Sequence, residues 1–298
     1  MKSLSEIKTI AVAGAGTMGA GIAQVCAQSG YDVWLFDVAE TALQKGMQLI
    51  EKNLSVAVEK GKLSEEEKLK TLSRIKTTIA ITDLKCDVLI EAVLEKLEVK
   101  QELFQRVAEV NNHNCLLSTN TSSIPISKIA EGLRQAQSNN NDNVTLSLSK
   151  RIVGMHFFNP PHLMKLVEVV SGKETSTEVA QLIFDLSKKL GKHPVMAKDR
   201  PGFIVNRIGK LYHTEPIKIL EEGIADVETI DALMEASGFK MGPFKLIDLI
   251  GVDANLNVTK SLYELMEQEE KFKPSATQQK MVDEGKLGKK SGEGFYKY

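Results

Sequence analysis

The amino-acid sequence predicts an α/β protein: a doubly wound, mostly parallel β-sheet followed by an all-α C-terminal domain. Three observations support this prediction. Short apolar runs alternate with helical patterns through residues 1–200, which is the order of elements in a doubly wound sheet. The first apolar run passes directly into a glycine-rich turn. Beyond Arg200-Pro201-Gly202 the strand patterns stop and helical patterns continue.

The glycine-rich turn follows an apolar strand that begins near Lys8 and precedes a helical pattern. In a Gly-x-Gly-x-x-Gly turn the first glycine leaves the strand tightly, the second lets the backbone approach a pyrophosphate, and the third lets the helix pack closely. The free N–H groups at the helix start then face the pyrophosphate charge. We therefore expect a Rossmann-type domain whose cofactor-binding turn comprises Gly14, Ala15, Gly16, Thr17, Met18 and Gly19.

A second strand pattern, Tyr31-Asp-Val-Trp-Leu-Phe36, ends in Asp37. A carboxylate at this place can accept hydrogen bonds from both ribose hydroxyls of the adenosine, whereas a 2′-phosphate would meet like charge. Asp37 therefore predicts NAD as the cofactor. An ordinary strand-to-helix turn would also contain glycines, but strand, glycines, helix and acid all fall in register here.

The remaining elements follow in order along the chain. We expect a helix over residues 39–60, then a charged segment at 61–76 with a helix start at Ser64. Buried strands are predicted at 86–90, 115–118 and 151–155, separated by helices over 95–110 and 123–133. The Asn-rich tract at 135–143 is interpreted as a surface loop or mobile insertion.

Helical patterns at residues 203–222, 227–236 and 252–269 make up the C-terminal part. We place the domain boundary near residue 200, with an NAD-binding domain at 1–200 and a helical substrate or dimerisation domain at 201–298. A length of 298 residues agrees with about two domains.

Composition narrows the functional class. The formal net charge is −1, from 38 basic and 39 acidic residues, so no global field would recruit nucleic acid or an anionic membrane. No apolar run is long enough to span a bilayer, and the N-terminus enters the first strand without a leader pattern. The three cysteines lie far apart in the sequence and in apolar patterns, which favours a reduced, cytoplasmic protein without a zinc site or disulfide framework.

The segment from Gly154 to Val170 contains two apolar runs joined by a Pro-rich connection, which predicts a strand, turn, strand unit. With the turn near residue 162, an antiparallel return brings Glu168 opposite His156 on the same face. A carboxylate beside an imidazole fixes the ring and stabilises the imidazolium, as needed to deprotonate an alcohol while hydride leaves its carbon. The alternative is a core histidine bonded to a carbonyl, with Glu168 a solvent-facing residue of an edge strand.

Two further patterns favour a site. Asn120-Thr-Ser-Ser123 follows a predicted buried strand, at the carboxyl edge where open α/β sheets bind ligands. Asn206, in the segment that begins at Asp199, starts the helical half with an amide that could face the same crevice.

The chain resembles the L-3-hydroxyacyl-CoA dehydrogenases, in particular the bacterial 3-hydroxybutyryl-CoA dehydrogenases, over nearly its whole length. The resemblance is carried by seven segments: residues 14–19, 120–123 (Asn-Thr-Ser-Ser), 156–160 (His-Phe-Phe-Asn-Pro), 165–168 (Lys-Leu-Val-Glu), 201–207 (Pro-Gly-Phe-Ile-Val-Asn-Arg), 241–244 (Met-Gly-Pro-Phe) and 288–296 (Gly-Lys-Lys-Ser-Gly-Glu-Gly-Phe-Tyr).

This resemblance implies NAD-dependent oxidation of an (S)-3-hydroxyacyl-CoA, 3-hydroxybutyryl-CoA first, to the 3-ketoacyl-CoA, and the reverse reduction. It implies that His156 is the general base, that Glu168 is its partner, and that Ser122 and Asn206 hydrogen-bond the reacting oxygen or the thioester end. In the family, the nicotinamide half of the cofactor is contacted by residues that correspond here to Glu95, Lys100, Asn120, Ser122, Asn159 and Lys290. Coenzyme A is contacted by residues that correspond here to Asn53 and Lys60. A homodimer through the helical half and a place in fatty acid or butanoate metabolism are also implied.

Three alternatives stay open. The substrate could be a medium- or long-chain 3-hydroxyacyl-CoA of β-oxidation. The chain could be a 2-hydroxyacid or 6-phosphogluconate type of dehydrogenase, although those relatives use a lysine as acid/base group. It could also be a non-catalytic NAD-binding protein, like the lens crystallins of this family.

The sequence departs from the family pattern in two places. The Asn-rich insertion, near residues 137–149, lengthens a connection. Leu211 stands where a proline is expected and Pro216 follows one turn later, where it predicts a helix kink.

Overall fold

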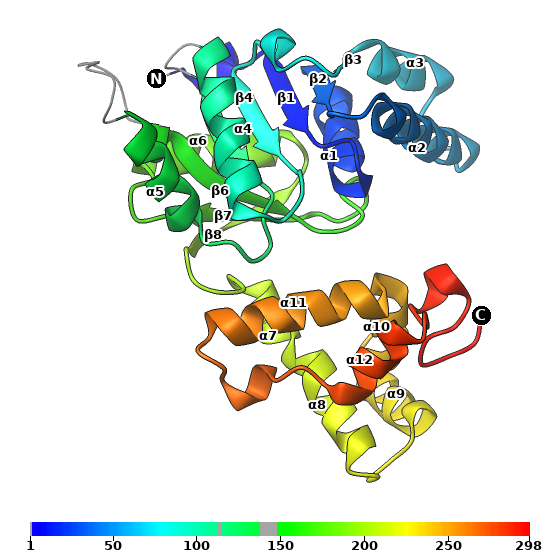
Figure 1. Ribbon diagram of the computed structural model, residues 1–298. Coiled ribbons are helices and arrows are strands. Elements are labelled where there is room, and N and C mark those ends of the chain that lie inside the picture. Colours follow the sequence, from blue (N-terminus) through cyan, green and yellow to red (C-terminus); the bar gives the residue numbers. More distant parts are fainter. Residues whose placement is uncertain (1, 112–114, 138–147) are drawn as a thin grey trace. The chain divides into compact units, whose positions relative to one another are not determined.

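The computed structural model describes residues 2–111, 115–137 and 148–298, and the chain divides into two compact units (Figure 1). Unit 1, Met1–Arg200, holds the sheet and its helices, and unit 2, Pro201–Tyr298, is helical. The predicted α/β class with a helical C-terminal part is confirmed. Each unit is described by itself below.

Unit 1 is built on an eight-stranded sheet of order β3-β2-β1-β4-β5-β6-β7-β8. Every neighbouring pair is parallel except β6 and β7. The strand order reverses between β1 and β4, which is where such sheets bind ligands. The strands are β1 (Thr9–Ala13), β2 (Asp32–Phe36), β3 (Ile75–Thr78), β4 (Val88–Glu91), β5 (Leu116–Thr119), β6 (Ile152–Phe157), β7 (Leu166–Ser171) and β8 (His193–Lys198).

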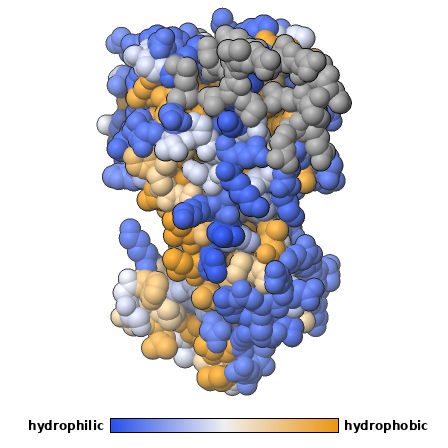
Figure 2. All heavy atoms as spheres, turned by 90° about the vertical axis from the view of Figure 1, so that its left-hand side faces the viewer, coloured by the Kyte–Doolittle hydropathy of each residue, from blue (hydrophilic) through white to orange (hydrophobic). Residues whose placement is uncertain are grey.

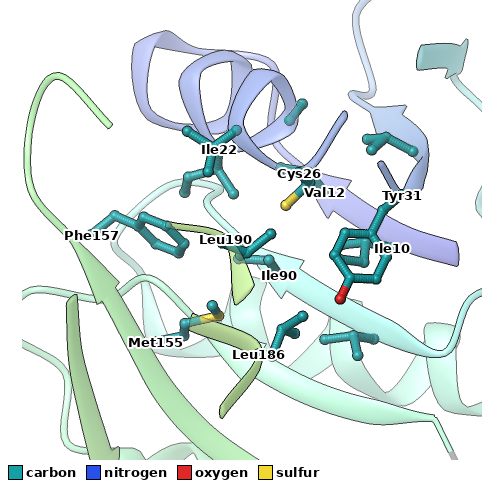
Figure 3. Packing of buried hydrophobic residues seen from close by; sticks show 14 of the residues in the cluster. Ile10, Val12, Ile22, Cys26, Tyr31, Ile90, Met155, Phe157, Leu186 and Leu190 are labelled. Carbon is teal, nitrogen blue, oxygen red and sulfur yellow. The ribbon is translucent and has the colours of Figure 1, made fainter. Parts of the chain in front are cut away.

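Helices cover both faces of this sheet. Side chains of α1 and α6 share one core with the sheet, as Figure 3 shows for Ile22 of α1, Met155 of β6 and Leu186 of α6. Helices α4 and α5 pack against each other and cover the opposite face (Figure 1). The helices of unit 1 are α1 (Thr17–Gln28), α2 (Glu40–Glu59), α3 (Glu65–Ser73), α4 (Leu97–Val110), α5 (Ile126–Gln137) and α6 (Thr177–Lys189).

Two strands of the sheet, β3 and β8, were not predicted, and nor was α6. Both strands lie at the edges of the sheet, so they bury few side chains. Strand β3 begins at the end of the predicted charged segment at 61–76 and runs beyond it, and β8 carries Pro194, which is tolerated on an edge strand. Edge strands of this kind therefore show only a weak apolar pattern in the sequence. Most of the Asn-rich tract, residues 138–143, lies outside the described residues, while 135–137 end α5.

Parallel pairing of β4 with β5 brings two cysteines together that are distant in the sequence. The Sγ atoms of Cys86 and Cys115 lie 3.7 Å apart, and both thiols are free. The third cysteine, Cys26, is also free, and burial raises its pKa to about 12. A raised pKa keeps this thiol protonated, so Cys26 serves as a small apolar side chain of the core in Figure 3.

Unit 2 differs from the predicted helices in two places. The helix expected over 203–222 is divided at Lys210 into α7 and α8, and Pro216 lies inside α8. The helix expected to reach residue 269 ends at Leu265, because Glu267 and Gln268 adopt positive φ angles of 54° and 63°. The helices, of which α10 and α12 were not predicted, are α7 (Val205–Gly209), α8 (Leu211–Glu221), α9 (Val227–Ala236), α10 (Pro243–Ile250), α11 (Val252–Leu265) and α12 (Ala276–Asp283).

Two buried aspartates hold the C-terminal segment onto these helices. Asp248 of α10 accepts hydrogen bonds from the backbone N–H groups of Phe295 and Tyr296, at 3.0 and 2.9 Å. Asp231 of α9 accepts one from the Tyr296 hydroxyl at 2.9 Å. Both carboxylates are fully buried, so these donors satisfy charges that would otherwise be costly to bury.

A buried polar cluster connects Lys210, between α7 and α8, with His213 of α8 and Asn255 of α11. Gln278 of α12 joins it by donating to Oδ1 of Asn255. Lys210 donates to the backbone oxygen and to Oδ1 of Asn255, at 2.7 and 2.9 Å. The amide nitrogen of Asn255 lies 2.8 Å from Nδ1 of His213. Burial lowers the pKa of Lys210 to about 7, and burial together with the nearby Lys210 charge lowers the pKa of His213 to about 3. Nothing in the sequence pattern predicted this cluster.

None of the helices in the described ranges has both the length and the apolar character that a bilayer-spanning segment needs.

Lys210→Met should remove a pH dependence of stability. Folded Lys210 loses its proton near pH 7, but in the unfolded chain the amine keeps it to about pH 10. The unfolded state therefore binds more protons in this window, and the free energy of unfolding rises with pH by up to about 1.4 kcal/mol per pH unit. Urea unfolding at pH 7, 8 and 9 should show this rise in the wild type and in the exposed control Lys240→Met, but not in Lys210→Met. Equal slopes in all three proteins would contradict the prediction.

Candidate active site

The glycine-rich turn has the geometry of a cradle. Gly14 has a φ of 101°, and a Cβ there would lie 2.4 Å from the carbonyl oxygen of Ala92. A Cβ on Gly19 would lie 1.7 Å from the Gly14 oxygen. In contrast, a Cβ on Gly16 would meet nothing within 4 Å. The open space lies beside the start of α1, whose first N–H groups have no partner within the helix, so the turn fits a pyrophosphate.

Asp37 lies beside this cradle, at the end of β2. Its Oδ2 accepts a hydrogen bond from the backbone N–H of Ala15 at 2.8 Å, and its Oδ1 accepts one from Ala39 at 3.0 Å. These bonds fix the carboxylate against the turn, and each oxygen keeps a lone pair for a ribose hydroxyl.

The predicted pairing of His156 with Glu168 is confirmed. Strands β6 and β7 are antiparallel, with His156 directly opposite Glu168. Nδ1 of His156 lies 2.8 Å from Oε2 of Glu168, and the side chains are 4% and 0% exposed. Strand β8 covers the far side of β7, so Glu168 is not the solvent-facing edge residue of the alternative interpretation. A carboxylate on Nδ1 assigns the ring proton to that nitrogen and leaves Nε2 as the proton acceptor.

Ser122 lies at this acceptor nitrogen. Its Oγ is 3.1 Å from Nε2 of His156. Ser122 belongs to the turn formed by residues 120–123, which leaves the carboxyl end of β5. Oδ1 of Asn120 accepts a hydrogen bond from the backbone N–H of Phe157 at 2.8 Å, so the first residue of the turn is tied to the strand that carries His156.

Glu95 holds the other side of the 120–123 turn. Its Oε1 accepts hydrogen bonds from the backbone N–H groups of Ser122 and Ser123, both at 3.0 Å, and from the Ser123 and Thr121 hydroxyls. Its Oε2 lies 3.1 Å from Nζ of Lys100. Burial raises the pKa of Glu95, but the Lys100 charge and the hydroxyl hydrogen bonds outweigh burial and hold that pKa below its ordinary value.

One charged residue of this region was missed by sequence reasoning. Glu91 is the last residue of β4, is fully buried, and accepts a hydrogen bond from Lys100 at 2.6 Å. Burial outweighs Lys100 and the hydrogen bonds around Glu91, so its pKa is raised. The signal was present in the sequence, because a glutamate directly follows the apolar run that predicts this strand.

The connection between β6 and β7 packs on the cofactor helix. A Cβ on Gly21 of α1 would lie 2.8 Å from Cδ of Pro161, so only a glycine lets the two segments approach. Nζ of Lys192 donates to the backbone oxygens of Pro161 and Met164. Desolvation and the nearby charge of another lysine lower the pKa of Lys192 to about 8. Asn159, an expected cofactor contact, is exposed in this connection.

The two expected coenzyme A contacts lie on or beside α2. A Cβ on Gly46 of that helix would lie only 2.8 Å from the carbonyl oxygen of Ala15, so α2 packs closely against the glycine-rich turn. Asn53 donates to Oε1 of Gln24 on α1 at 3.2 Å. Lys60 follows the last turn of α2 and is exposed. The arrangement leaves the Lys60 ammonium available for a phosphate.

Two expected site residues belong to unit 2. Asn206 is the second residue of α7, and Lys290 donates to Oδ2 of Asp253 at 2.8 Å. Their roles at the site stay predictions. Within the described part of the chain, no group of three or more His, Cys, Asp or Glu side chains could hold a metal ion.

Each unit also matches a known protein family. Residues 9–200 match the family described as "3-hydroxyacyl-CoA dehydrogenase, NAD binding domain". Residues 202–298 match "3-hydroxyacyl-CoA dehydrogenase, C-terminal domain". The chain belongs to the 3-hydroxyacyl-CoA dehydrogenase family. Both the resemblance read from the sequence and the prediction of NAD are confirmed by these matches.

Individual members of the 3-hydroxyacyl-CoA dehydrogenase family give the same picture. A 3-hydroxyadipyl-CoA dehydrogenase of Escherichia coli is 45% identical over 98% of this chain, which spans only 59% of that relative's length. The human mitochondrial hydroxyacyl-coenzyme A dehydrogenase is 40% identical, covering 98% of this chain and 91% of the human one. The crystal structure of (S)-3-hydroxybutyryl-CoA dehydrogenase from Ralstonia eutropha is similar with a TM-score of 0.88, at 38% identity, covering 98% and 99% of the two chains.

Gly19→Ala and Gly16→Ala should separate packing from cofactor binding. A methyl group at Gly19 collides with the Gly14 oxygen, so we expect a loss of about 1–3 kcal/mol in the free energy of unfolding. A methyl group at Gly16 enters open space, so stability should stay within about 0.5 kcal/mol while NADH affinity falls. Urea unfolding and NADH fluorescence titration measure the two effects. Wild-type NADH affinity in Gly16→Ala would show that the pyrophosphate does not lie in this turn.

Asp37→Ala combined with Val38→Arg should relax the preference for NADH over NADPH by about tenfold or more, because the double variant replaces a repelling carboxylate by a cation. Val38 is 83% exposed, so an arginine there meets no packing constraint. Val38→Arg alone is the matched control and should keep most of the preference. Binding of both cofactors is compared by fluorescence titration; an unchanged preference in the double variant would place ribose recognition elsewhere.

Proposed function

We propose that this chain is an NAD-dependent (S)-3-hydroxyacyl-CoA dehydrogenase that interconverts 3-hydroxybutyryl-CoA and acetoacetyl-CoA. The observation that carries this proposal is the buried His156–Glu168 pair with the Ser122 hydroxyl at Nε2. Membership of the family makes a 3-hydroxyacyl thioester the substrate class to which this geometry applies.

The chain's own residues handle the proton of the reaction. Nε2 of His156 takes the proton of the 3-hydroxyl group as its O–H bond breaks and the carbonyl forms. Glu168 stabilises the resulting imidazolium through Nδ1, and in the reverse direction the imidazolium returns the proton to oxygen. The glycine-rich turn and Asp37 would hold NAD, which when bound would supply the acceptor for the hydride from the same carbon. The sum is (S)-3-hydroxyacyl-CoA + NAD⁺ ⇌ 3-ketoacyl-CoA + NADH + H⁺.

The binding roles in this proposal are those that the family resemblance implies. Ser122 and Asn206 are proposed to hydrogen-bond the reacting oxygen or the thioester end. Contacts with the nicotinamide half of NAD are proposed for Glu95, Asn120, Ser122, Asn159 and Lys290. The side chain of Lys100 is 1% exposed, so we propose that its part in this group of residues is indirect, through Glu95. Asn53 and Lys60 are proposed to contact coenzyme A; the exposed Lys60 supports this, since an ammonium binds phosphate well.

A homodimer formed through unit 2 is part of the proposal. Unit 2 exposes large apolar side chains, with Ile208, Ile224 and Leu233 each more than 60% exposed. The face in Figure 2 also shows hydrophobic residues interrupting a mainly hydrophilic surface. The proposed contact area between subunits would cover such exposed apolar side chains.

The test measures NADH oxidation by the full chain with acetoacetyl-CoA, longer 3-ketoacyl-CoA substrates up to C16, 3-oxoadipyl-CoA and free 2- and 3-ketoacids. The relatives' names span several acyl groups, so the panel includes both short and ω-carboxylated chains. We expect reduction of the thioesters, fastest at four carbons, and none of the free acids. Faster turnover at C16 would support the long-chain alternative. Reduction of free acids alone would support the 2-hydroxyacid type, and NADH binding without any turnover would support a crystallin-like protein.

His156→Gln is the control variant in this assay. It should lower kcat by about a hundred to ten thousandfold, because the general base is lost, and leave NADH affinity nearly intact. Normal turnover in this variant would remove His156 from the mechanism.

A further inference from the structure

We propose that Lys100, anchored by Glu91, is a positioning residue that sets the place of Ser122 through Glu95. This inference rests on the proposed function, in which Ser122 and His156 meet the reacting oxygen. It assigns Glu91 a part in the reaction and gives Lys100 a task other than the direct cofactor contact that the family resemblance implies.

Glu91 is a fixed anchor. It is fully buried at the end of β4, where the parallel register places it beside Thr119 of β5. Its Oε2 accepts a hydrogen bond from the Thr119 hydroxyl at 2.6 Å, and its Oε1 accepts one from the backbone N–H of Val93 at 2.7 Å and one from Lys100 at 2.6 Å. Three donors from three different segments leave this carboxylate little freedom to move.

Lys100 connects the anchor to the turn. Its side chain is 1% exposed, and Nζ lies 2.6 Å from Oε1 of Glu91 and 3.1 Å from Oε2 of Glu95. A buried ammonium is tolerated only when it is paired and hydrogen-bonded, and both conditions are met here by carboxylates. Because so little of its surface is exposed, Lys100 can influence the 120–123 turn only through Glu95.

Glu95 transmits this constraint. One of its oxygens is held by Lys100, and the other receives four donors from residues 121–123. Four donors on one oxygen require an ionised carboxylate, and Lys100 favours that state by helping to hold the pKa of Glu95 low. Since Ser122 Oγ lies 3.1 Å from Nε2 of His156, the turn's position determines that contact.

The 120–123 turn would keep only part of its support without Lys100. Asn120 would still be tied to Phe157 of β6. Glu95, whose side chain is 39% exposed, would keep its hydrogen bonds to residues 121–123 but would lose the link that fixes it to Glu91. A small displacement of a catalytic group can cost about a hundredfold in rate. The loss is expected mainly in kcat, because the glycine-rich turn and Asp37, which are proposed to hold the rest of NAD, are untouched.

The test uses a double-mutant cycle between Lys100 and Ser122. Lys100→Met and Glu91→Gln/Lys100→Met are each made in the wild type and in Ser122→Ala; the double substitution removes both charges, so no carboxylate is left buried and unpaired at position 91. Arg106→Met, on the exposed side of the same helix, is the matched control. Circular dichroism and thermal unfolding check each fold, and kcat and the KM for NADH are measured with acetoacetyl-CoA.

We expect both Lys100 variants to lower kcat by about tenfold or more and to change the KM for NADH by less than about threefold. In the Ser122→Ala background the same substitutions should cost less than about threefold, because the group they position is gone. Additive losses in kcat, a rise in KM with unchanged kcat, or failure of the doubly substituted protein to fold would each overturn the proposal. A wild type that does not reduce acetoacetyl-CoA would instead count against the proposed function.

Discussion

Burial of charged side chains at the carboxyl edge of the sheet is the constraint on which the rest of the site depends. Glu91 and Glu168 are both fully buried, and a buried carboxylate costs several kcal/mol unless a cation or several donors compensate. Each is paired with one nitrogen-containing side chain: Glu91 with Lys100 and Glu168 with His156. Because these partners come from other segments, the requirement for pairing fixes α4 against β4 and the His156 ring against β7. The site is therefore ordered by the same interactions that make the burial of its charges tolerable.

Parallel pairing then gathers the pieces. Strands β1, β4, β5 and β6 run in the same direction, so the glycine-rich turn, Glu91, the 120–123 turn and the end of β6 all emerge at one edge. The antiparallel return of β7 adds Glu168 to this edge without another crossover. Gly14 and Gly21 permit two close approaches, to Ala92 and to Pro161, that join the cofactor cradle to the strands and connection on the catalytic side. Neither approach leaves room for a larger side chain.

The sequence was most informative where local patterns carry the chemistry. The glycine spacing with Asp37, and the position of Glu168 relative to His156 across a Pro-rich turn, could be predicted because each depends on a short segment. It was least informative at edges and across neighbouring strands. Strands β3 and β8 bury too few side chains to show a clear pattern, and the break at Lys210 is marked in the sequence only by Gly209 before it, inside a longer helical pattern. The contacts of Lys100 could not be predicted, because Glu91, Glu95 and Thr119 meet only through parallel pairing and the return of α4.

Lys100 shares its charge between Glu91 and Glu95, and this sharing explains how the three residues can hold the 120–123 turn in place. Ionising both Glu91 and Glu95 around Lys100 would bury a net negative charge, so the two carboxyl groups compete for the ammonium. The pKa of Glu91 is raised and that of Glu95 is lowered. Glu95 therefore stays ionised more readily, although Glu91 lies closer to the Lys100 nitrogen. Glu91 is held in place by Thr119, Val93 and Lys100. Glu95 needs its charge, because the four donors of the 120–123 turn all converge on one of its oxygens, and a protonated carboxyl group would offer them a weaker acceptor.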